Sequence, residues 1–267
     1  MPGNNIIETH NLTKKYKDFS AVDDISFTVK RGEVFAFLGP NGAGKTTTIR
    51  MLTTLLNPDK GDIIVNGFDP KKNKADVRKS FGIVFQDPSL DNELTAFENL
   101  EFHGVMYDVS KKIRRERIEL LLKFVGLQDR RNDFVKNFSG GMKRRLEIAR
   151  GLIHHPKILF LDEPTIGLDP QTRNHLWEYI KKSNKEEEMT VFLTTHYMEE
   201  AENMADTIAI IDLGKIVAKG TSEDLKKQTN ESSLEKAFLQ LTGKQIREEV
   251  GTARDRAKFQ GRMWGSR

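Results

Sequence analysis

The 267-residue sequence contains no cysteine. This absence excludes disulfide bonds, thiolate ligation of zinc or iron–sulfur clusters, and a cysteine nucleophile. No apolar run approaches the roughly 20 residues needed to cross a bilayer; the longest runs suit buried strands and are Val34–Leu38, Ile158–Leu161 and Ile208–Ile211. Residues Met1–Asn5 have neither a basic flank nor an apolar stretch, so we expect no secretory signal and a protein that stays inside the cell.

The formal net charge of +4 resides in the C-terminal residues. Seven basic and three acidic residues follow Thr242, so the rest of the chain is neutral. A basic tail on a neutral body argues against a broad nucleic-acid surface, and we predict no nucleic-acid partner. Residues 243–267 are expected to form a basic extension. It is either a helix whose apolar face contacts anionic lipid or a partner, or a solvated disordered tail, which Gly251 and Gly261 favour.

Short β-rich runs alternate with helical stretches along residues 6–242. The predicted strands are Val34–Leu38, Ile63–Val65, Gly82–Phe85, Ile158–Leu161, Val191–Thr194 and Thr207–Ile211. Several are apolar without alternation, which indicates parallel strands covered on both faces and an α/β fold. The predicted helices are Lys45–Leu56, Ala96–Met106, Lys111–Phe124, Gly140–Ile153, Gln171–Lys182 and Met198–Met204.

Three segments depart from this alternation. Strand signals are missing from about residue 87 to 155, which predicts a helical subdomain inserted into the α/β core. Ile6–Asn11 and Ala21–Val29 suggest a small antiparallel sheet at the N-terminus, and residues 208–218 read as a hairpin.

The clearest motif follows the strand Val34–Leu38 and precedes a predicted helix. Residues 39–46 match G-x-x-x-x-G-K-[ST], in which glycines let backbone N–H groups surround a phosphate at a helix N-terminus. Lys45 can reach the β- and γ-phosphates, and the Thr46 hydroxyl can bind Mg²⁺. The sequence therefore predicts a nucleoside triphosphate site formed by Gly39, Pro40, Asn41, Gly42, Ala43, Gly44, Lys45, Thr46 and Thr47.

Two acidic residues end another buried strand, Ile158–Leu161. We predict that Asp162 holds Mg²⁺ and that Glu163 orients or deprotonates the attacking water. A GTPase is the alternative, because Asn73–Asp76 spells N-K-x-D. That motif stands too soon after the phosphate-binding loop and ends no apolar strand, so we interpret it as a solvated loop.

Residues 138–145, Phe-Ser-Gly-Gly-Met-Lys-Arg-Arg, resemble the signature sequence of ABC transporters. With this run, residues 6–242 resemble the ATP-binding subunit of that family, and residues 86–90 and 93–100 are similar to its daunorubicin/doxorubicin-resistance type of exporter ATPase. The resemblance implies a P-loop NTPase (RecA-like) core with a mostly parallel sheet, an N-terminal antiparallel β subdomain and an inserted helical subdomain.

A predicted N-cap at Ser139, followed by two glycines, would leave helix N–H groups free for a second anion. The resemblance implies that two subunits pair head to tail, so that Ser139, Gly140 and Gly141 close on ATP held by the other subunit. It also implies that Asp169 lies in a loop across that interface. Met142 departs from the glutamine usual in the family, and a thioether cannot replace the hydrogen bonds of an amide.

The family supplies roles for three more residues. The resemblance implies that Gln86 contacts Mg²⁺ and the attacking water, that His196 touches the γ-phosphate, and that Tyr16 stacks on adenine. Catalysis would then involve Glu163, His196, Gln86 and Lys45, and the metal ligands would be Thr46, Gln86 and Asp162.

The sequence thus predicts an ATPase that uses ATP and Mg²⁺. We expect it to pair with a second ATPase subunit in a homodimer, to power an exporter through separate transmembrane permease subunits, and to lie at the cytoplasmic side of the cell membrane. Two alternatives remain at this point. One is a soluble ABC ATPase of the Fe–S cluster assembly type, and the other is a nucleotide-sensing regulator without turnover.

Overall fold

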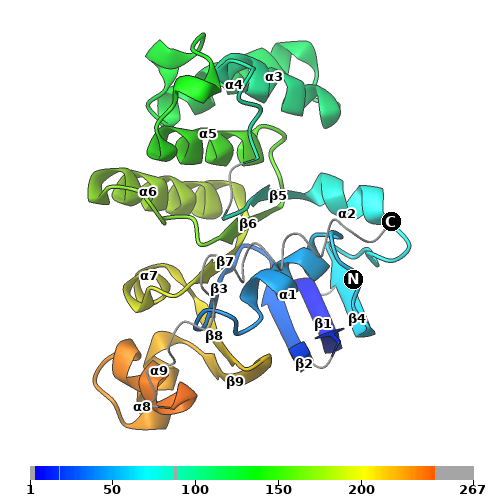
Figure 1. Ribbon diagram of the computed structural model, residues 1–267, viewed down its shortest axis with the longest axis vertical. Helices are drawn as coiled ribbons and strands as arrows, with labels where there is room; N and C mark the ends of the chain where they lie inside the picture. Colours follow the sequence, from blue (N-terminus) through cyan, green and yellow to red (C-terminus); the bar gives the residue numbers. More distant parts are fainter. Residues whose placement is uncertain (1–3, 18, 87–88, 244–267) are drawn as a thin grey trace.

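A six-stranded sheet forms the centre of the computed structural model, which describes residues 4–17, 19–86 and 89–243 (Figure 1). Its strand order is β5-β6-β7-β3-β8-β9; the first five strands are parallel and β9 is antiparallel to β8. The strands are β3 Val34–Leu38, β5 Phe81–Val84, β6 Ile158–Asp162, β7 Thr190–Thr195, β8 Thr207–Asp212 and β9 Lys215–Gly220. A second, antiparallel sheet of order β2-β1-β4 consists of β1 Asn5–Tyr16, β2 Phe19–Lys30 and β4 Lys60–Val65. The predicted α/β class, parallel sheet, N-terminal antiparallel sheet and hairpin are confirmed.

Every residue of the central strands β3, β6 and β7 is buried. Because successive side chains of a strand point to opposite faces, both faces of the sheet are covered at these strands. In β3, Val34, Ala36 and Leu38 belong to a core shared with the helices, whereas Phe35 and Phe37 belong to a second core under the N-terminal sheet. This division repeats in β6, β7 and β8. It explains why these strands are apolar without alternation.

The helices cover the sheet and extend beyond it at both ends. Figure 1 shows α3, α4 and α5 as a group above the sheet, while α8 and α9 lie at the opposite end. The helices are α1 Lys45–Leu52, α2 Lys74–Ser80, α3 Ala96–Met106, α4 Lys111–Phe124, α5 Gly140–Leu152, α6 Pro170–Glu187, α7 Met198–Met204, α8 Ser222–Thr229 and α9 Leu234–Thr242. Two 3₁₀ turns, η1 Gln128–Arg130 and η2 Val135–Asn137, connect α4 to α5.

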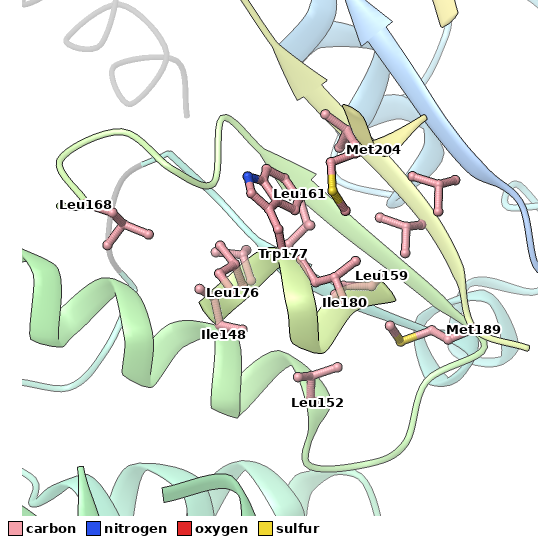
Figure 2. Close-up of a cluster of buried hydrophobic side chains, with 14 of the residues drawn as sticks. Ile148, Leu152, Leu159, Leu161, Leu168, Leu176, Trp177, Ile180, Met189 and Met204 are labelled. Atoms are coloured by element: carbon pink, nitrogen blue, oxygen red, sulfur yellow. The ribbon is translucent and has the colours of Figure 1, made fainter. Parts of the chain in front are cut away.

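Helix α5 joins the helical group to the core through α6. Ile148 and Leu152 of α5 are buried and lie close to Leu176 and Ile180 of α6, beside the sheet residue Leu161 (Figure 2). One continuous apolar cluster therefore runs from the sheet into the helical group.

Two predicted segments were wrong. Helix α1 ends at Leu52 and not at Leu56, because Thr54 adopts a positive φ of 64°, which a helix cannot continue through. The expected solvated loop around Asn73–Asp76 is the start of α2, and the buried Val77 anchors that helix in the second core. Helices α8 and α9 were not predicted, although their N-caps Thr221 and Ser233 are readable signals.

No helix in residues 4–17, 19–86 and 89–243 is long and apolar enough to span a membrane. The basic extension predicted over 243–267 lies, apart from Gly243, outside the described residues.

A pair of histidines predicts how stability depends on pH. Burial, with a smaller contribution from the nearby Arg150, lowers the pKa of His103 to about 3. Burial also lowers the pKa of His154 to about 4, although a hydrogen bond to the Phe81 carbonyl opposes this shift. Both rings stay neutral in the folded protein, whereas the unfolded chain takes up protons near pH 6.5. The free energy of unfolding should therefore fall as the pH decreases from about 6.5 to 4, by about 1–2 kcal/mol per ring at pH 5.

Urea unfolding at pH 7 and pH 5 measures this loss. The double variant His103→Gln/His154→Gln should lose much less stability between the two pH values than wild type does. His10→Gln, at a ring that is 61% exposed, is the control and should behave like wild type. Equal pH dependence in all three proteins would contradict the assignment to His103 and His154.

Candidate functional site

Four adjacent parallel strands bring the predicted site residues to one edge of the main sheet. In the order β5-β6-β7-β3, the residues at or after the strand ends are Gln86, Asp162 with Glu163, His196, and the loop that begins at Gly39. The strands end level with one another, since Asp162 pairs with Thr194 and Thr195 pairs with Leu38. Ligands of α/β proteins bind at such carboxyl edges.

The loop between β3 and α1 requires glycine at two close approaches. A Cβ on Gly44, whose φ is 109°, would lie 2.4 Å from the Ala21 carbonyl oxygen, and one on Gly39 would lie 2.4 Å from that of Ile211. Gly44 is also the N-cap of α1, which has neither a side-chain cap nor an acidic residue in its first turn. The N–H groups there are left for an anion.

Lys45 places a buried cation against this loop. Its Nζ donates to the carbonyl oxygens of Gly39 at 2.6 Å and Pro40 at 3.2 Å, and lies 3.3 Å from Oε1 of Glu163. Burial lowers the pKa of Lys45, and the Glu163 carboxylate opposes that change. A bound triphosphate would favour the charged form further.

Asp162 has the environment of a magnesium ligand. Its Oδ1 accepts a 2.5 Å hydrogen bond from the Thr194 hydroxyl, whereas Oδ2 is buried without a hydrogen-bond partner in the structure. Burial raises its pKa, and the hydroxyls of Thr194 and Thr46 oppose the rise. The described residues contain no cluster of three or more metal-binding side chains. The donors available here are the Asp162 carboxylate and the Thr46 hydroxyl. They fit Mg²⁺, which is bound by few protein ligands and by substrate phosphates.

Glu163 occupies a constrained position between two basic groups. It is 8% exposed and its φ is 49°, an uncommon backbone conformation for a residue other than glycine. Its Oε1 lies 3.3 Å from both Lys45 Nζ and His196 Nδ1, and its backbone N–H donates to the Thr194 carbonyl at 3.1 Å. The carboxylate is thus held at the sheet edge, next to the loop.

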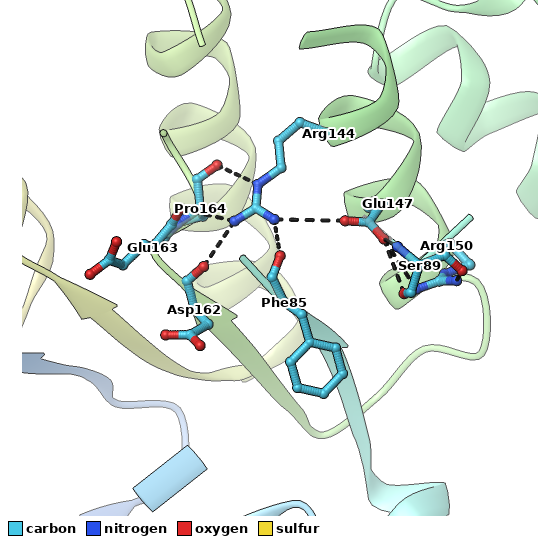
Figure 3. A network of polar contacts seen from close by, with 8 residues as sticks. All are labelled: Phe85, Ser89, Arg144, Glu147, Arg150, Asp162, Glu163 and Pro164. Atoms are coloured by element: carbon cyan, nitrogen blue, oxygen red, sulfur yellow. Dashed lines mark hydrogen bonds and ion pairs between the residues drawn. The ribbon is translucent and has the colours of Figure 1, made fainter. Parts of the chain in front are cut away.

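Arg144 of α5 fixes the backbone around these acids (Figure 3). Its Nη2 donates to the carbonyl oxygens of Asp162 and Glu163, both at 2.9 Å, and its Nε donates to that of Pro164 at 2.8 Å. Its Nη1 donates to the Phe85 carbonyl, next to Gln86. One buried guanidinium therefore ties α5 to the ends of both β5 and β6.

Glu147 compensates the buried charge of Arg144. It is fully buried, lies 3.7 Å from Arg144 Nη1 and 3.5 Å from Arg150 Nη2, and accepts a 2.5 Å hydrogen bond from the Ser89 N–H. Arg150 in turn donates to the Ser89 carbonyl oxygen at 2.7 Å (Figure 3). The network links α5 to the segment that follows β5.

The N-terminus of α5 lies apart from the loop of the same chain. Figure 1 shows α5 in the helical group, on the far side of β5 and β6 from α1. Ser139 caps α5 and accepts a 3.3 Å hydrogen bond from the Met142 N–H, with Gly140 and Gly141 following it. The half-buried Met142 side chain packs against the apolar core.

The remaining predicted residues lie at the periphery. Gln86 is exposed just after β5, and Tyr16 is half-buried at the end of β1, with its ring centroid 5.9 Å from Lys14 Nζ. Asp169 is exposed and caps α6 by accepting hydrogen bonds from the N–H and hydroxyl of Thr172. The structure does not bring Tyr16, Ser139 or Asp169 into contact with the acids.

Comparison with known proteins decides the family. The family model described as ABC transporter matches residues 22–166. The chain belongs to the ABC transporter family. It is 46% identical over 220 residues to the linearmycin resistance ATP-binding protein LnrL of Bacillus subtilis (strain 168), covering 82% of this chain and 70% of that protein. It is also 46% identical over 220 residues to the daunorubicin/doxorubicin resistance ATP-binding protein DrrA of Streptomyces peucetius, covering 82% of this chain and 66% of that protein.

A solved structure supports the assignment. The dimeric post-hydrolysis state of the ATP-binding cassette MJ0796 bound to ADP and Pi matches with a TM-score of 0.75 and 29% identity, over 80% of this chain and 98% of that one. The ABC ATPase fold and the resemblance to daunorubicin/doxorubicin-resistance ATPases predicted from the sequence are confirmed. As a member of this family the chain is an ATPase.

Some residues that organise this ABC ATPase site were not predicted from the sequence. Thr194 anchors both acids, and Arg144 with Glu147 supports their backbone. Arg144 belongs to the basic run 143–145, in which nothing marks the buried member. The acidic Glu147 on the same helix face, three residues later, is a signal that could have indicated an internal pair.

Proposed function

We propose that this chain is the ATP-hydrolysing subunit of an exporter and energises transport through separate transmembrane subunits by ATP-driven head-to-tail dimerisation. The observation that carries the proposal is the convergence of the loop, Lys45, Asp162, Glu163 and His196 at one sheet edge, with the α5 N-terminus outside it. The resistance functions in the names of LnrL and DrrA favour an exporter over the Fe–S cluster assembly alternative.

The loop supports triphosphate binding at the N-terminus of α1. The N–H groups of residues 39–47 and the Lys45 ammonium would bind the phosphates, with Tyr16 placed to stack on the base. Thr46, Asp162 and the exposed Gln86 would hold Mg²⁺. When bound, Mg²⁺ would neutralise charge that develops on the phosphates.

Hydrolysis would depend on the pair Glu163 and His196. The Glu163 carboxylate, held by Lys45 and His196, is placed to orient a water molecule and accept its proton. His196 would donate a hydrogen bond toward the γ-phosphate. The positive φ of Glu163 directs its carboxylate, and Thr194 and Arg144 hold the backbone in that conformation.

The second anion site would act across a dimer. Because α5 lies apart from the loop of its own chain, Ser139, Gly140 and Gly141 would contact ATP held by a second copy, with Asp169 at the same interface. The dimeric form of MJ0796 supports this pairing.

Ser139→Arg tests the contribution across the dimer. The added guanidinium at the α5 N-cap should block closure, so ATP-dependent dimerisation is expected to fall at least about tenfold while the monomer binds ATP as wild type does. Gel filtration and nucleotide titration of a Glu163→Gln background measure the two properties. Unchanged dimerisation would contradict the contribution of Ser139 across the interface.

Exposed apolar residues on the helical group support a membrane partner. Phe102, Val105 and Met106 of α3 are 61%, 52% and 63% exposed, and Leu120 of α4 is 68% exposed. Exposed apolar residues mark a protein interface where they form one contiguous surface, and these four are the candidates for it on the helical group. They would contact the cytoplasmic side of the transmembrane subunits.

Coexpression with a candidate transmembrane permease tests the exporter assignment. The chain is expected to sediment with membranes only when that protein is present, and its ATP turnover should then respond to the transported compound. A chain that hydrolyses ATP but never associates with the membrane protein would contradict the transport function while leaving the ATPase intact.

A further inference from the structure

A cavity of about 500 Å³ lies between the helical group and α6. Its walls come from residues 123–126 at and just after the end of α4, from Arg145 and Ile148 of α5, and from residues 168–176. Ligand pockets in proteins have volumes of about 300–1,000 Å³. The size of this cavity is therefore that of a small-molecule site.

The floor of the cavity is apolar and preformed. Four apolar side chains line it, and each of them is buried in the protein: Val125, Ile148, Leu168 and Leu176. Figure 2 shows that Ile148, Leu168 and Leu176 come from α5, from the loop before α6 and from α6 itself. Phe124 also lines the cavity, and its ring is stacked on Tyr179 with centroids 3.5 Å apart. These side chains are held by the surrounding fold.

Basic groups stand around this apolar floor. Lys123, Arg145 and His175 line the cavity, and in the described part of the chain neither Lys123 nor Arg145 has a carboxylate oxygen within 4.0 Å. One N–H of the Arg145 guanidinium donates to the Val125 carbonyl oxygen at 2.9 Å. Its other N–H groups remain as donors for a ligand. Asp169 is the acidic lining residue, and its carboxylate oxygens accept hydrogen bonds from Thr172. The Asp169 carboxylate keeps its negative charge and His175 has Glu178 at 3.8 Å, so the two permanent cations Lys123 and Arg145 leave the lining with a small excess of positive charge.

We propose that this cavity binds a small amphipathic organic anion. Its apolar body would contact Ile148, Leu168 and Leu176, and its anionic group would pair with Lys123 and Arg145. Both parts of the cavity are needed, because the leucines and the isoleucine supply binding area and the two cations select for charge.

The position of the cavity gives the ligand a regulatory effect. The walls belong to the helical group on one side and to α6 with Asp169 on the other. A bound anion holds these two parts in one arrangement and thereby changes the rate of ATP hydrolysis. This effect rests on the proposed function, whereas binding itself does not.

Isothermal titration of the full chain with decanoate tests the site. We expect saturable binding of one decanoate per chain, and at least about tenfold weaker binding to Lys123→Glu, which replaces attraction by repulsion. Lys112→Glu makes the same charge change at another exposed position of α4 and should bind as wild type does. Equal affinities of the two variants, or no saturable binding, would overturn the proposal.

Two further probes examine the ligand class. Decanol, which has the same chain without charge, should bind at least about tenfold more weakly than decanoate; equal binding would overturn an anion site. Binding to phosphatidylglycerol vesicles without binding of free decanoate would assign the charges to lipid contact and overturn the cavity site.

The regulatory effect is measured as ATP turnover at saturating decanoate. A change of about twofold or more in wild type, absent in Lys123→Glu, supports it. Binding that leaves turnover unchanged would overturn the regulatory effect and retain the site. Absence of ATP turnover without decanoate would instead count against the proposed function.

Discussion

Glu163→Gln is expected to lower steady-state ATP turnover by about 10²–10⁴-fold while ATP-dependent dimers still form. Glutamine matches the shape of the side chain, so the backbone at φ 49° and its hydrogen bond to Thr194 can persist. An amide cannot accept a proton from water, and it removes the negative charge 3.3 Å from Lys45 and His196. Nucleotide binding depends on the loop and should remain.

Phosphate release measures the ATP turnover, and gel filtration in the presence of ATP measures the dimers. Glu199→Gln is a suitable control, because Glu199 is an exposed acid close in sequence to His196, and its turnover should equal that of wild type. Wild-type turnover in Glu163→Gln would remove Glu163 from the catalytic role.

Arg144→Met should impair both folding stability and hydrolysis. The substitution leaves the carbonyl oxygens of Asp162, Glu163 and Pro164 without their donor and Glu147 with one cationic neighbour fewer. Breaking a buried ionic network of this kind costs about 3–5 kcal/mol. Because Arg144 also holds the backbone of Glu163, turnover should fall at least about tenfold in protein that is still folded.

The readout that separates positioning from stability is kinetic. At a temperature where the variant is fully folded by circular dichroism, the turnover number should fall while the affinity for ATP stays within about twofold of wild type. Lys143→Met, which removes only a 2.8 Å hydrogen bond to Asn92, should change neither. A variant with lower stability but normal turnover would show that Arg144 is structural only.

Much of the fold follows from patterns that depend on local sequence. The apolar runs around Val34 and Ile158 predicted buried parallel strands, because a strand covered on both faces needs apolar residues at every position. The loop at Gly39 and the acids after Leu161 predicted one edge of the sheet, because carboxyl ends of parallel strands meet there. These signals lie within a few consecutive residues each.

What could not be predicted depends on contacts between distant segments. Arg144 looks like its neighbours Lys143 and Arg145, and only the tertiary structure buries it against β5 and β6. The short helix α2 has a charged sequence, and its one buried apolar residue, Val77, packs in a core formed by other elements. The cavity beside α6 likewise has walls from three separated segments.

The strict division of each central strand between two cores limits where this chain can change in length. Adding or removing one residue within β3 would exchange the large aromatic rings of Phe35 and Phe37 with the small Ala36 and with Leu38 on the opposite face. It would also displace the loop at Gly39 relative to Asp162. Insertions should therefore be tolerated in connections such as residues 230–232 between α8 and α9, while the strands that precede the site keep a constant number of residues.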